Sequence, residues 1–220
     1  MSRGRAGLPA LHLVTSDQVL EAPAFLDRAT AVLAAHGPSV ALHVRGHGLG
    51  GGALLRTVRT LTTAGAAMLL VNDRLDVALA AGTGAQIGRR SLSVALARQL
   101  LPDRWLGYSA HAAREAEDAV EAGADFVVLG TIFATASHPG RSGSGVSLIG
   151  AVAPPVPVLA IGGITPERVG PCVAAGAHGV AVLGGVWGSD DPVAATASYL
   201  QALRAARSPG SGGSAAGESA

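Results

Sequence analysis

Short apolar segments alternate along the chain with longer, alanine-rich segments, and each apolar segment ends in a polar or glycine-rich turn. A short apolar run bounded by turns is typical of a buried strand, and apolar residues that recur every three or four positions are typical of a helix. The pattern predicts strands at 10–15, 40–45, 66–71, 85–87, 105–109, 126–130, 157–162 and 179–184. It predicts helices at 22–35, 53–64, 74–81, 91–101, 112–123 and 146–152, then from Pro166 onward and at 191–206.

Eight strand–helix units therefore follow one another along most of the chain. Consecutive βα units make the strands parallel, and eight units predict a closed (β/α)8 TIM barrel of the α/β class. The rival fold, an open doubly wound sheet, usually has fewer units and a glycine fingerprint after its first strand. Residues 15–18 read TSDQ and carry no such fingerprint. We expect one barrel domain at 1–207 and a disordered Gly/Ser-rich tail at 208–220.

The composition removes several classes of function. All 16 basic side chains are arginine, which excludes the lysine Schiff base of class I aldolases and pyridoxal phosphate enzymes. A net charge of +1 without a basic run argues against nucleic acid as a partner. No segment is long and apolar enough to span a membrane, and with no signal-peptide core we expect a cytoplasmic protein. The single cysteine, Cys172, is expected to be buried and structural.

The chemistry of such a barrel lies at the carboxyl ends of its strands, so polar residues there are the candidates. On the second strand, His43 and Arg45 share a face that points inward, where an arginine needs an anionic ligand or an internal carboxylate such as Asp73. Asp73, after the third strand, is a candidate metal ligand, helix cap or partner of Arg45. Ser109 and His111 share a face after the fifth strand, where a histidine can move protons near neutral pH.

Two further features point to an anionic ligand. The loop after the sixth strand is unusually long, as ligand loops on this face often are. Its donors are Thr135, Ser137, His138 and Arg141. The seventh and eighth strands each end in a glycine pair whose N–H groups can hold a phosphate at a helix N-terminus. These pairs are Gly162–Gly163 and Gly184–Gly185.

Taken in order, the motifs resemble the thiamine phosphate synthase/TenI family over about residues 10–200. They read VTSD, HVRGH, LLVNDRLDVA, GYSAH, TIFATASHPG, GVSL, AIGGITPE and GVAVLGG. The resemblance implies one of two activities. The synthase couples an aminopyrimidine diphosphate to a thiazole phosphate, using magnesium and expelling pyrophosphate. The TenI-type tautomerase moves a proton on a carboxylated thiazole phosphate without a metal.

Individual positions depart from the synthase pattern. Its Q-x-R-E-K stretch reads His43-Val44-Arg45-Gly46-His47 here, and its T-x-T-K loop reads Thr135-Ala136-Ser137-His138. Ser91 replaces its second metal-binding aspartate. The loss of a carboxylate and two lysines weakens the hold on magnesium and on pyrophosphate. Asp73 is nevertheless retained, and the available replacement cations are Arg89, Arg90 and Arg141.

These departures favour a thiazole tautomerase, an isomerase that needs no cofactor. The resemblance then implies His111 and His43 as the catalytic residues. Substrate-binding residues would be Arg45, Ser109, Thr135, Ser137 and His138, and the phosphate would lie on Gly162, Gly163, Gly184 and Gly185. The alternative is a divergent synthase, a transferase with Mg²⁺ on Asp73. A non-catalytic barrel that binds a phosphate ligand is favoured less. The expected partner is a small thiazole phosphate, and a homodimer is left open.

Overall fold

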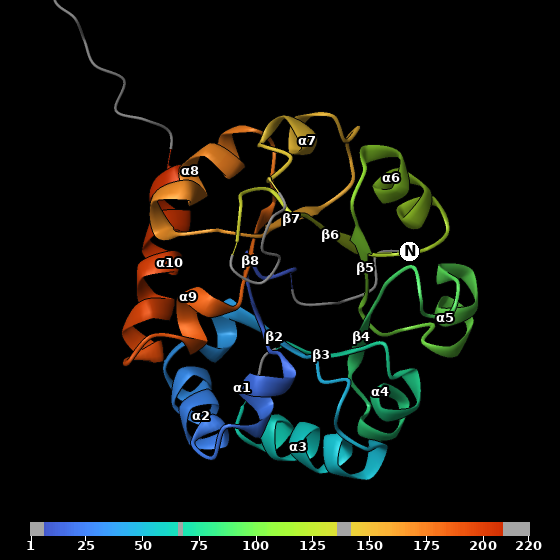
Figure 1. The fold of residues 1–220 in the computed structure, drawn as a ribbon. Coiled ribbons are helices and arrows are strands. Elements are labelled where there is room, and N and C mark those ends of the chain that lie inside the picture. Colours follow the sequence, from blue (N-terminus) through green and yellow to red (C-terminus); the bar gives the residue numbers. More distant parts are fainter. Residues whose placement is uncertain (1–6, 66–67, 136–141, 209–220) are drawn as a thin grey trace, which may run out of the picture.

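The computed structural model describes residues 7–65, 68–135 and 142–208. Eight parallel strands form a closed barrel in which each strand pairs with its neighbours in sequence and β8 pairs with β1 (Figure 1). The strands are β1 (Leu11–Val14), β2 (Val40–Val44), β3 (Met68–Asn72), β4 (Gly84–Ile87), β5 (Leu106–Ala110), β6 (Phe126–Gly130), β7 (Val158–Ile161) and β8 (Gly179–Val182). The predicted barrel is confirmed, and the ends of its strands lie within two residues of those expected.

Helices surround the barrel on its outside (Figure 1). They are α1 (Asp17–Glu21), α2 (Phe25–His36), α3 (Gly51–Thr63), α4 (Leu75–Ala81), α5 (Val94–Leu100), α6 (Ala113–Glu121), α7 (Ser147–Gly150), α8 (Pro166–Ala174), α9 (Gly184–Trp187) and α10 (Pro192–Arg207), with a 3-10 turn at Gly37–Ser39. The last helix, α10, ends at Arg207, and the domain boundary expected there stays a prediction. Apart from Ser208, the predicted tail lies outside the described residues.

Two helical features differ from the prediction. Two helices occur where one was expected at 22–35. The helix α2 begins at Phe25, and α1, which was not predicted, precedes it and ends at Glu21 because Ala22 is extended, as the residue before a proline usually is. Ser16 starts the first of them by accepting a hydrogen bond from the Val19 N–H at 3.4 Å. The short helix α9, which directly follows β8, was not predicted at all.

Alternation along the strands divides the core into two parts. One set of apolar side chains packs between the strands and the helices. The other fills the barrel interior and consists of Val14, Ala41, Met68, Leu70, Phe126, Val128, Leu159 and Ala181. Five polar side chains of the described residues are buried at or below 1% exposure, namely His12, Thr15, His43, Gln86 and Thr196. Cys172 is also buried, as predicted, and burial raises the pKa of its thiol to about 11.

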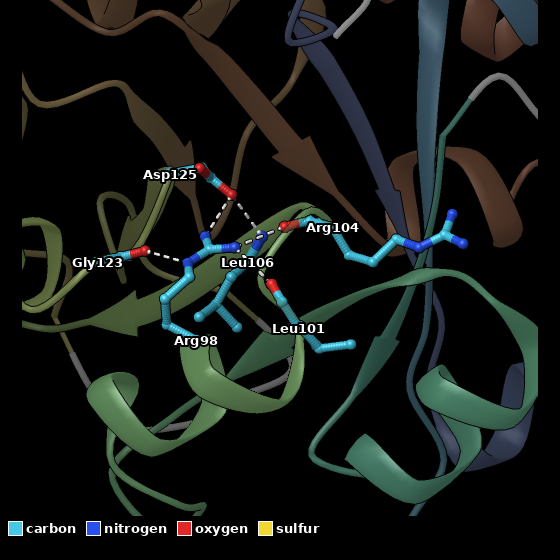
Figure 2. Close-up of polar contacts among 6 residues, drawn as sticks. All are labelled: Arg98, Leu101, Arg104, Leu106, Gly123 and Asp125. Atoms are coloured by element: carbon cyan, nitrogen blue, oxygen red, sulfur yellow. Dashed lines mark hydrogen bonds and ion pairs between the residues drawn. The ribbon is translucent and has the colours of Figure 1, made fainter. Parts of the chain in front are cut away.

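A guanidinium group fastens the ends of β5 and β6 that lie opposite the expected mouth (Figure 2). Arg98 donates to the carbonyls of Gly123, Leu101 and Arg104 at 2.7–3.0 Å and to Asp125 Oδ2 at 2.7 Å. The same carboxylate oxygen accepts the Leu106 N–H at 2.8 Å. One side chain therefore donates to three loop carbonyls and to one carboxylate at this end of the barrel.

Large exposed apolar side chains gather on and near α5. Leu92, Leu96 and Leu100, four residues apart, are 46–50% exposed, as is Leu79 of α4. Leu96 and Leu100 are four residues apart within α5 and so share one face of the helix, whereas Leu92 precedes the helix. Exposed apolar stripes of this kind occur where chains associate, so the homodimer stays a prediction. Within the described ranges, no helix has the length and apolar character needed to cross a membrane.

Candidate active site

The carboxyl ends of β3 and β4 bring two oxygen-bearing side chains together. Asp73 follows β3 with a φ of 62°, an uncommon left-handed conformation that Asp adopts more readily than most residues. Its N–H still extends the ladder to the Gln86 carbonyl, at 2.9 Å. A tight turn after β4 places the Ser91 hydroxyl where it accepts from the Gly88 N–H at 3.1 Å and donates to Asp73 Oδ1.

This contact decides between the roles expected for Asp73. Among the described residues there is no ion pair between Asp73 and Arg45, and the Asp73 side chain does not cap α4, which starts without a side-chain cap. Those two interpretations are wrong because the carboxylate turns toward β4 instead. A role in metal binding remains.

The residues fit magnesium but not a metal held by protein alone. No group of three or more His, Cys, Asp or Glu side chains that could hold a metal occurs in the described part of the chain. Magnesium, however, commonly takes one or two carboxylates and completes its shell with water and substrate phosphates. A serine hydroxyl is also a known magnesium ligand in phosphate-binding loops. Asp73 and Ser91 would be the residues that hold it.

His111 lies at the end of β5 with one ring nitrogen already used. Its Nδ1 lies 2.6 Å from the Gly130 carbonyl, which can only accept, so Nδ1 carries the proton. In the neutral ring Nε2 is then the free base. Glu115 holds the backbone here, because its carboxylate accepts the His111 N–H at 2.8 Å and the Tyr108 hydroxyl at 3.1 Å. Burial, then Glu115, raises the pKa of Tyr108.

Ser109 accepts a hydrogen bond from Gln86 Nε2 at 2.9 Å. Gln86 is a buried residue of β4 that the sequence reasoning missed. Its signal was available, since an amide in the apolar run of a barrel strand needs a partner inside the barrel.

His43 points into the barrel, as its alternation predicted, but it is 1% exposed. His12 Nε2 lies 3.1 Å from the Pro9 carbonyl and therefore carries a proton, so His43 Nε2 donates to His12 Nδ1 across 2.7 Å. Burial lowers the pKa of His43 to about 3 and lowers that of His12 well below its usual value. Both rings are neutral at pH 7. His12 has a hydrogen-bond partner on each ring nitrogen, and the catalytic role of His43 stays a prediction.

The glycine pairs lie where expected, and three of the four glycines leave no room for a side chain, whereas a Cβ on Gly184 would meet nothing within 4 Å. Gly162 and Gly163 have φ of 101° and 60°, and a Cβ would come within 2.4 Å of Thr131 and of the Ala134 carbonyl respectively. Gly184 and Gly185 are the first residues of α9, whose backbone bonding starts at Val186 and Trp187. A Cβ on Gly185 would lie 2.0 Å from the Tyr199 hydroxyl, which bonds to the Ile164 carbonyl.

The remaining candidates are placed only in part. Arg45 is half-buried, and its backbone is held by Thr15, whose hydroxyl bonds to the N–H of Arg45 at 2.8 Å. Thr135 is half-buried in the loop after β6. Ser137, His138 and Arg141 lie outside the described residues. Arg89 and Arg90 are exposed within the turn that ends at Ser91.

A closed (β/α)8 barrel with a short extra helix after β8 has the architecture on which TIM-barrel enzymes commonly place a phosphate site. The family can also be stated. Residues 11–186 match the family model described as thiamine monophosphate synthase, and the chain belongs to this thiamine phosphate synthase/TenI family.

Three similar proteins illustrate the relationship. The bifunctional thiamine biosynthesis protein ThiM/ThiE of Symbiobacterium thermophilum is 43% identical over 146 residues, which are 64% of this chain and 30% of that protein. The thiamine-phosphate synthase of Methanoculleus marisnigri is 38% identical over 208 residues, 91% of this chain and 98% of that protein. The structure of thiamine phosphate pyrophosphorylase from Pyrococcus furiosus has a TM-score of 0.77 at 24% identity, covering 90% of this chain and 97% of that one, and supports the fold. The name of the full-length relative favours the synthase over the tautomerase predicted first.

Proposed function

We propose that this chain is a magnesium-dependent thiamine phosphate synthase, which joins an aminopyrimidine diphosphate to a thiazole phosphate and releases pyrophosphate. The observation that carries the proposal is the contact between Ser91 and Asp73. The two positions at which the family is expected to bind its metal meet in this chain, and both present oxygen. The serine that looked like a lost ligand in sequence therefore still faces the site.

The site residues would have different roles in binding the metal and the two substrates. Asp73 and Ser91 would hold magnesium, which when bound neutralises charge on the departing pyrophosphate. The N–H groups of Gly184 and Gly185 would bind the thiazole phosphate at the start of α9. Ser109 would donate a hydrogen bond to the bound diphosphate, and His111 borders the same opening.

Arginine supplies the cations that the synthase pattern takes from lysine. Arg89 and Arg90 occupy the two central positions of the turn between Gly88 and Ser91, where the Ser91 N–H bonds to the Gly88 carbonyl at 2.9 Å. Both residues are exposed in the turn that ends at Ser91, and a planar guanidinium binds phosphate through two parallel hydrogen bonds.

A second candidate function is the thiazole tautomerase. It is favoured by His111, whose Nδ1 is bonded to the Gly130 carbonyl and whose Nε2 is available as a base. The single carboxylate at Asp73 also favours it, because proton transfer needs no metal. A positioned base of nearly neutral pKa suffices for this reaction.

Two assays on one preparation separate these functions. The first supplies aminopyrimidine diphosphate, thiazole phosphate and magnesium, and measures released pyrophosphate with and without chelator. The second follows ultraviolet absorbance as the unrearranged carboxylated thiazole phosphate becomes aromatic in the presence of chelator. We expect pyrophosphate release that chelator abolishes and that Asp73→Asn reduces at least about 100-fold, the scale of losing a catalytic electrostatic group.

The contrary outcomes are equally definite. Chelator-resistant conversion of the thiazole that His111→Asn abolishes, without pyrophosphate release, would establish the tautomerase. Tight binding of thiazole phosphate with neither activity would favour the non-catalytic barrel.

A further inference from the structure

A buried glutamine lies directly beneath one of the substrate-binding residues. Gln86, on β4, is 1% exposed and donates from Nε2 to Ser109 Oγ on the neighbouring strand β5, at 2.9 Å. The Gln86 amide therefore lies next to the candidate site without being one of the residues expected to bind substrate. Any effect of Gln86 on the substrate is exerted through its hydrogen bond to Ser109.

The Gln86 side chain fits inside the barrel because the residue opposite it on β5, Gly107, has no side chain. A Cβ on Gly107 would lie 2.0 Å from Gln86 Oε1 and 2.4 Å from the Phe126 ring. Gly107 therefore allows both groups to occupy the interior, and the packing restricts where the amide can lie. A polar group whose conformation is set by its packing can orient its partner accurately.

The other end of the amide is unsatisfied. Gln86 Oε1 is buried without a hydrogen-bond partner among the described residues. A buried acceptor without a donor lowers the stability of a fold. The presence of Gln86 at this position therefore calls for an explanation other than stability. The hydrogen bond from Nε2 to Ser109 is the contact that Gln86 makes with its side chain.

The direction of that hydrogen bond fixes the chemistry of Ser109. A serine hydroxyl has one proton to donate and two lone pairs that accept. Because Gln86 donates to Oγ, one lone pair is occupied and the proton remains for another acceptor. Ser109 shares its strand face with His111, at the carboxyl end of β5, where the anionic substrate is expected.

We propose that Gln86 is a positioning residue that turns the Ser109 hydroxyl into a hydrogen-bond donor toward the bound phosphate substrate. The inference rests on the proposed function, in which Ser109 contacts that substrate. Without Gln86 the hydroxyl can rotate and point its proton into the barrel, so the donor is lost for part of the time.

The test is a double-mutant cycle on the full chain with Gln86→Met, Ser109→Ala and the two together. Methionine keeps the length of the side chain and removes the donor, and Gln99→Met makes the same change at an exposed position of α5. We expect Gln86→Met to lower kcat about 10-fold, the scale of one hydrogen bond, with the KM for thiazole phosphate changed less than about 2-fold. The double variant should match Ser109→Ala alone, and Gln99→Met should match the wild type.

Multiplicative losses in the double variant, or a wild-type kcat for Gln86→Met, would overturn the inference. Should Gln86→Met not fold, Gln86→Asn keeps the amide but cannot reach Ser109, and the same non-additivity is expected. The Kd of the aminopyrimidine diphosphate, measured by calorimetry for the four proteins, separates the two proposals. A non-additive Kd cycle in a protein without turnover supports the role of Gln86 and refutes the reaction. Turnover with an additive cycle does the reverse, and neither binding nor turnover refutes both.

Discussion

Ser91 donates its hydroxyl hydrogen to Asp73 Oδ1 across the mouth of the barrel, although the two residues are 18 positions apart in the chain. The contact depends on the left-handed backbone of Asp73 and on the tight turn that positions Ser91 after β4. Strained backbone of this kind is common at functional sites. The pair defines where a divalent cation would bind if the chain is a synthase.

Restoring a carboxylate at this pair should strengthen metal binding. We expect Ser91→Asp to lower the magnesium concentration that gives half-maximal pyrophosphate release by about 10-fold, because magnesium prefers carboxylate ligands. The measurement is a magnesium titration of the synthase assay. Ser93→Asp adds the same charge two residues away at the cap of α5 and should leave the titration unchanged. Equal curves for all three proteins would contradict a metal site at Asp73.

The guanidinium that fastens the opposite end of the barrel should matter for stability. Arg98 and Asp125 are 19% and 22% exposed, and Arg98→Met removes the guanidinium that donates to this carboxylate and to three carbonyls (Figure 2). We expect the free energy of unfolding to fall by about 3 kcal/mol, measured by urea denaturation. The control is Arg114→Met, since the side chain of Arg114 is 77% exposed and its ion pairs contribute little. Similar losses in both variants would show that Arg98 has no special role.

Stability should fall in mild acid because of the buried imidazole pair. The folded chain keeps His12 and His43 neutral, with the pKa of His43 lowered to about 3, whereas the unfolded chain protonates both below about pH 6.5. The unfolded state therefore binds more protons between these values, and stability rises with pH there and is lost as pH falls. Each imidazole contributes about 1.4 kcal/mol per pH unit below pH 6.5.

Urea denaturation at pH 5.0 and 7.5 checks this expectation, with His43→Gln as the comparison. The variant removes one of the two titrating groups, so the difference between the two pH values should shrink. An unchanged difference would mean that other groups produce the acid sensitivity.

Two glycines with open space around them should respond oppositely to alanine. At Gly52, in the first turn of α3, a Cβ would meet only Arg56 Nη1 at 3.8 Å, and at Gly176 it would meet nothing within 4 Å. Gly176, however, has a φ of 102°. We expect Gly52→Ala to increase the free energy of unfolding by about 0.5 kcal/mol and Gly176→Ala to decrease it by about 1 kcal/mol. The melting temperature should rise in the first variant and fall in the second. Changes of the same sign would refute backbone conformation as the cause.

Much of the architecture could be read from local patterns. Period-two alternation gives a strand two faces, so the inward direction of His43 was predictable from its neighbours Leu42 and Val44. The end of α1 before Ala22 follows from Pro23, because the residue before a proline is usually extended. The glycine pairs after β7 and β8 indicated a close approach of backbone. These features depend on residues adjacent in sequence.

The predictions that were wrong or missing concern which side chains contact each other. Asp73 was expected to cap a helix or to pair with Arg45, and it bonds to Ser91 instead. Gln86 was passed over because nothing near it in sequence shows that Ser109, 23 residues later, lies on the adjacent strand within hydrogen-bond distance. Such pairings depend on the register between strands.

The sequence by itself determined the (β/α)8 barrel, the end of the barrel that carries the chemistry and the glycine pairs that suit a phosphate, because these follow from periodicity and turn chemistry. The tertiary structure alone decided that Ser91 faces Asp73, that His43 is bonded to His12, and that Gln86 supports Ser109. Barrel closure sets the register of every strand at once, and only that register determines which distant side chains meet.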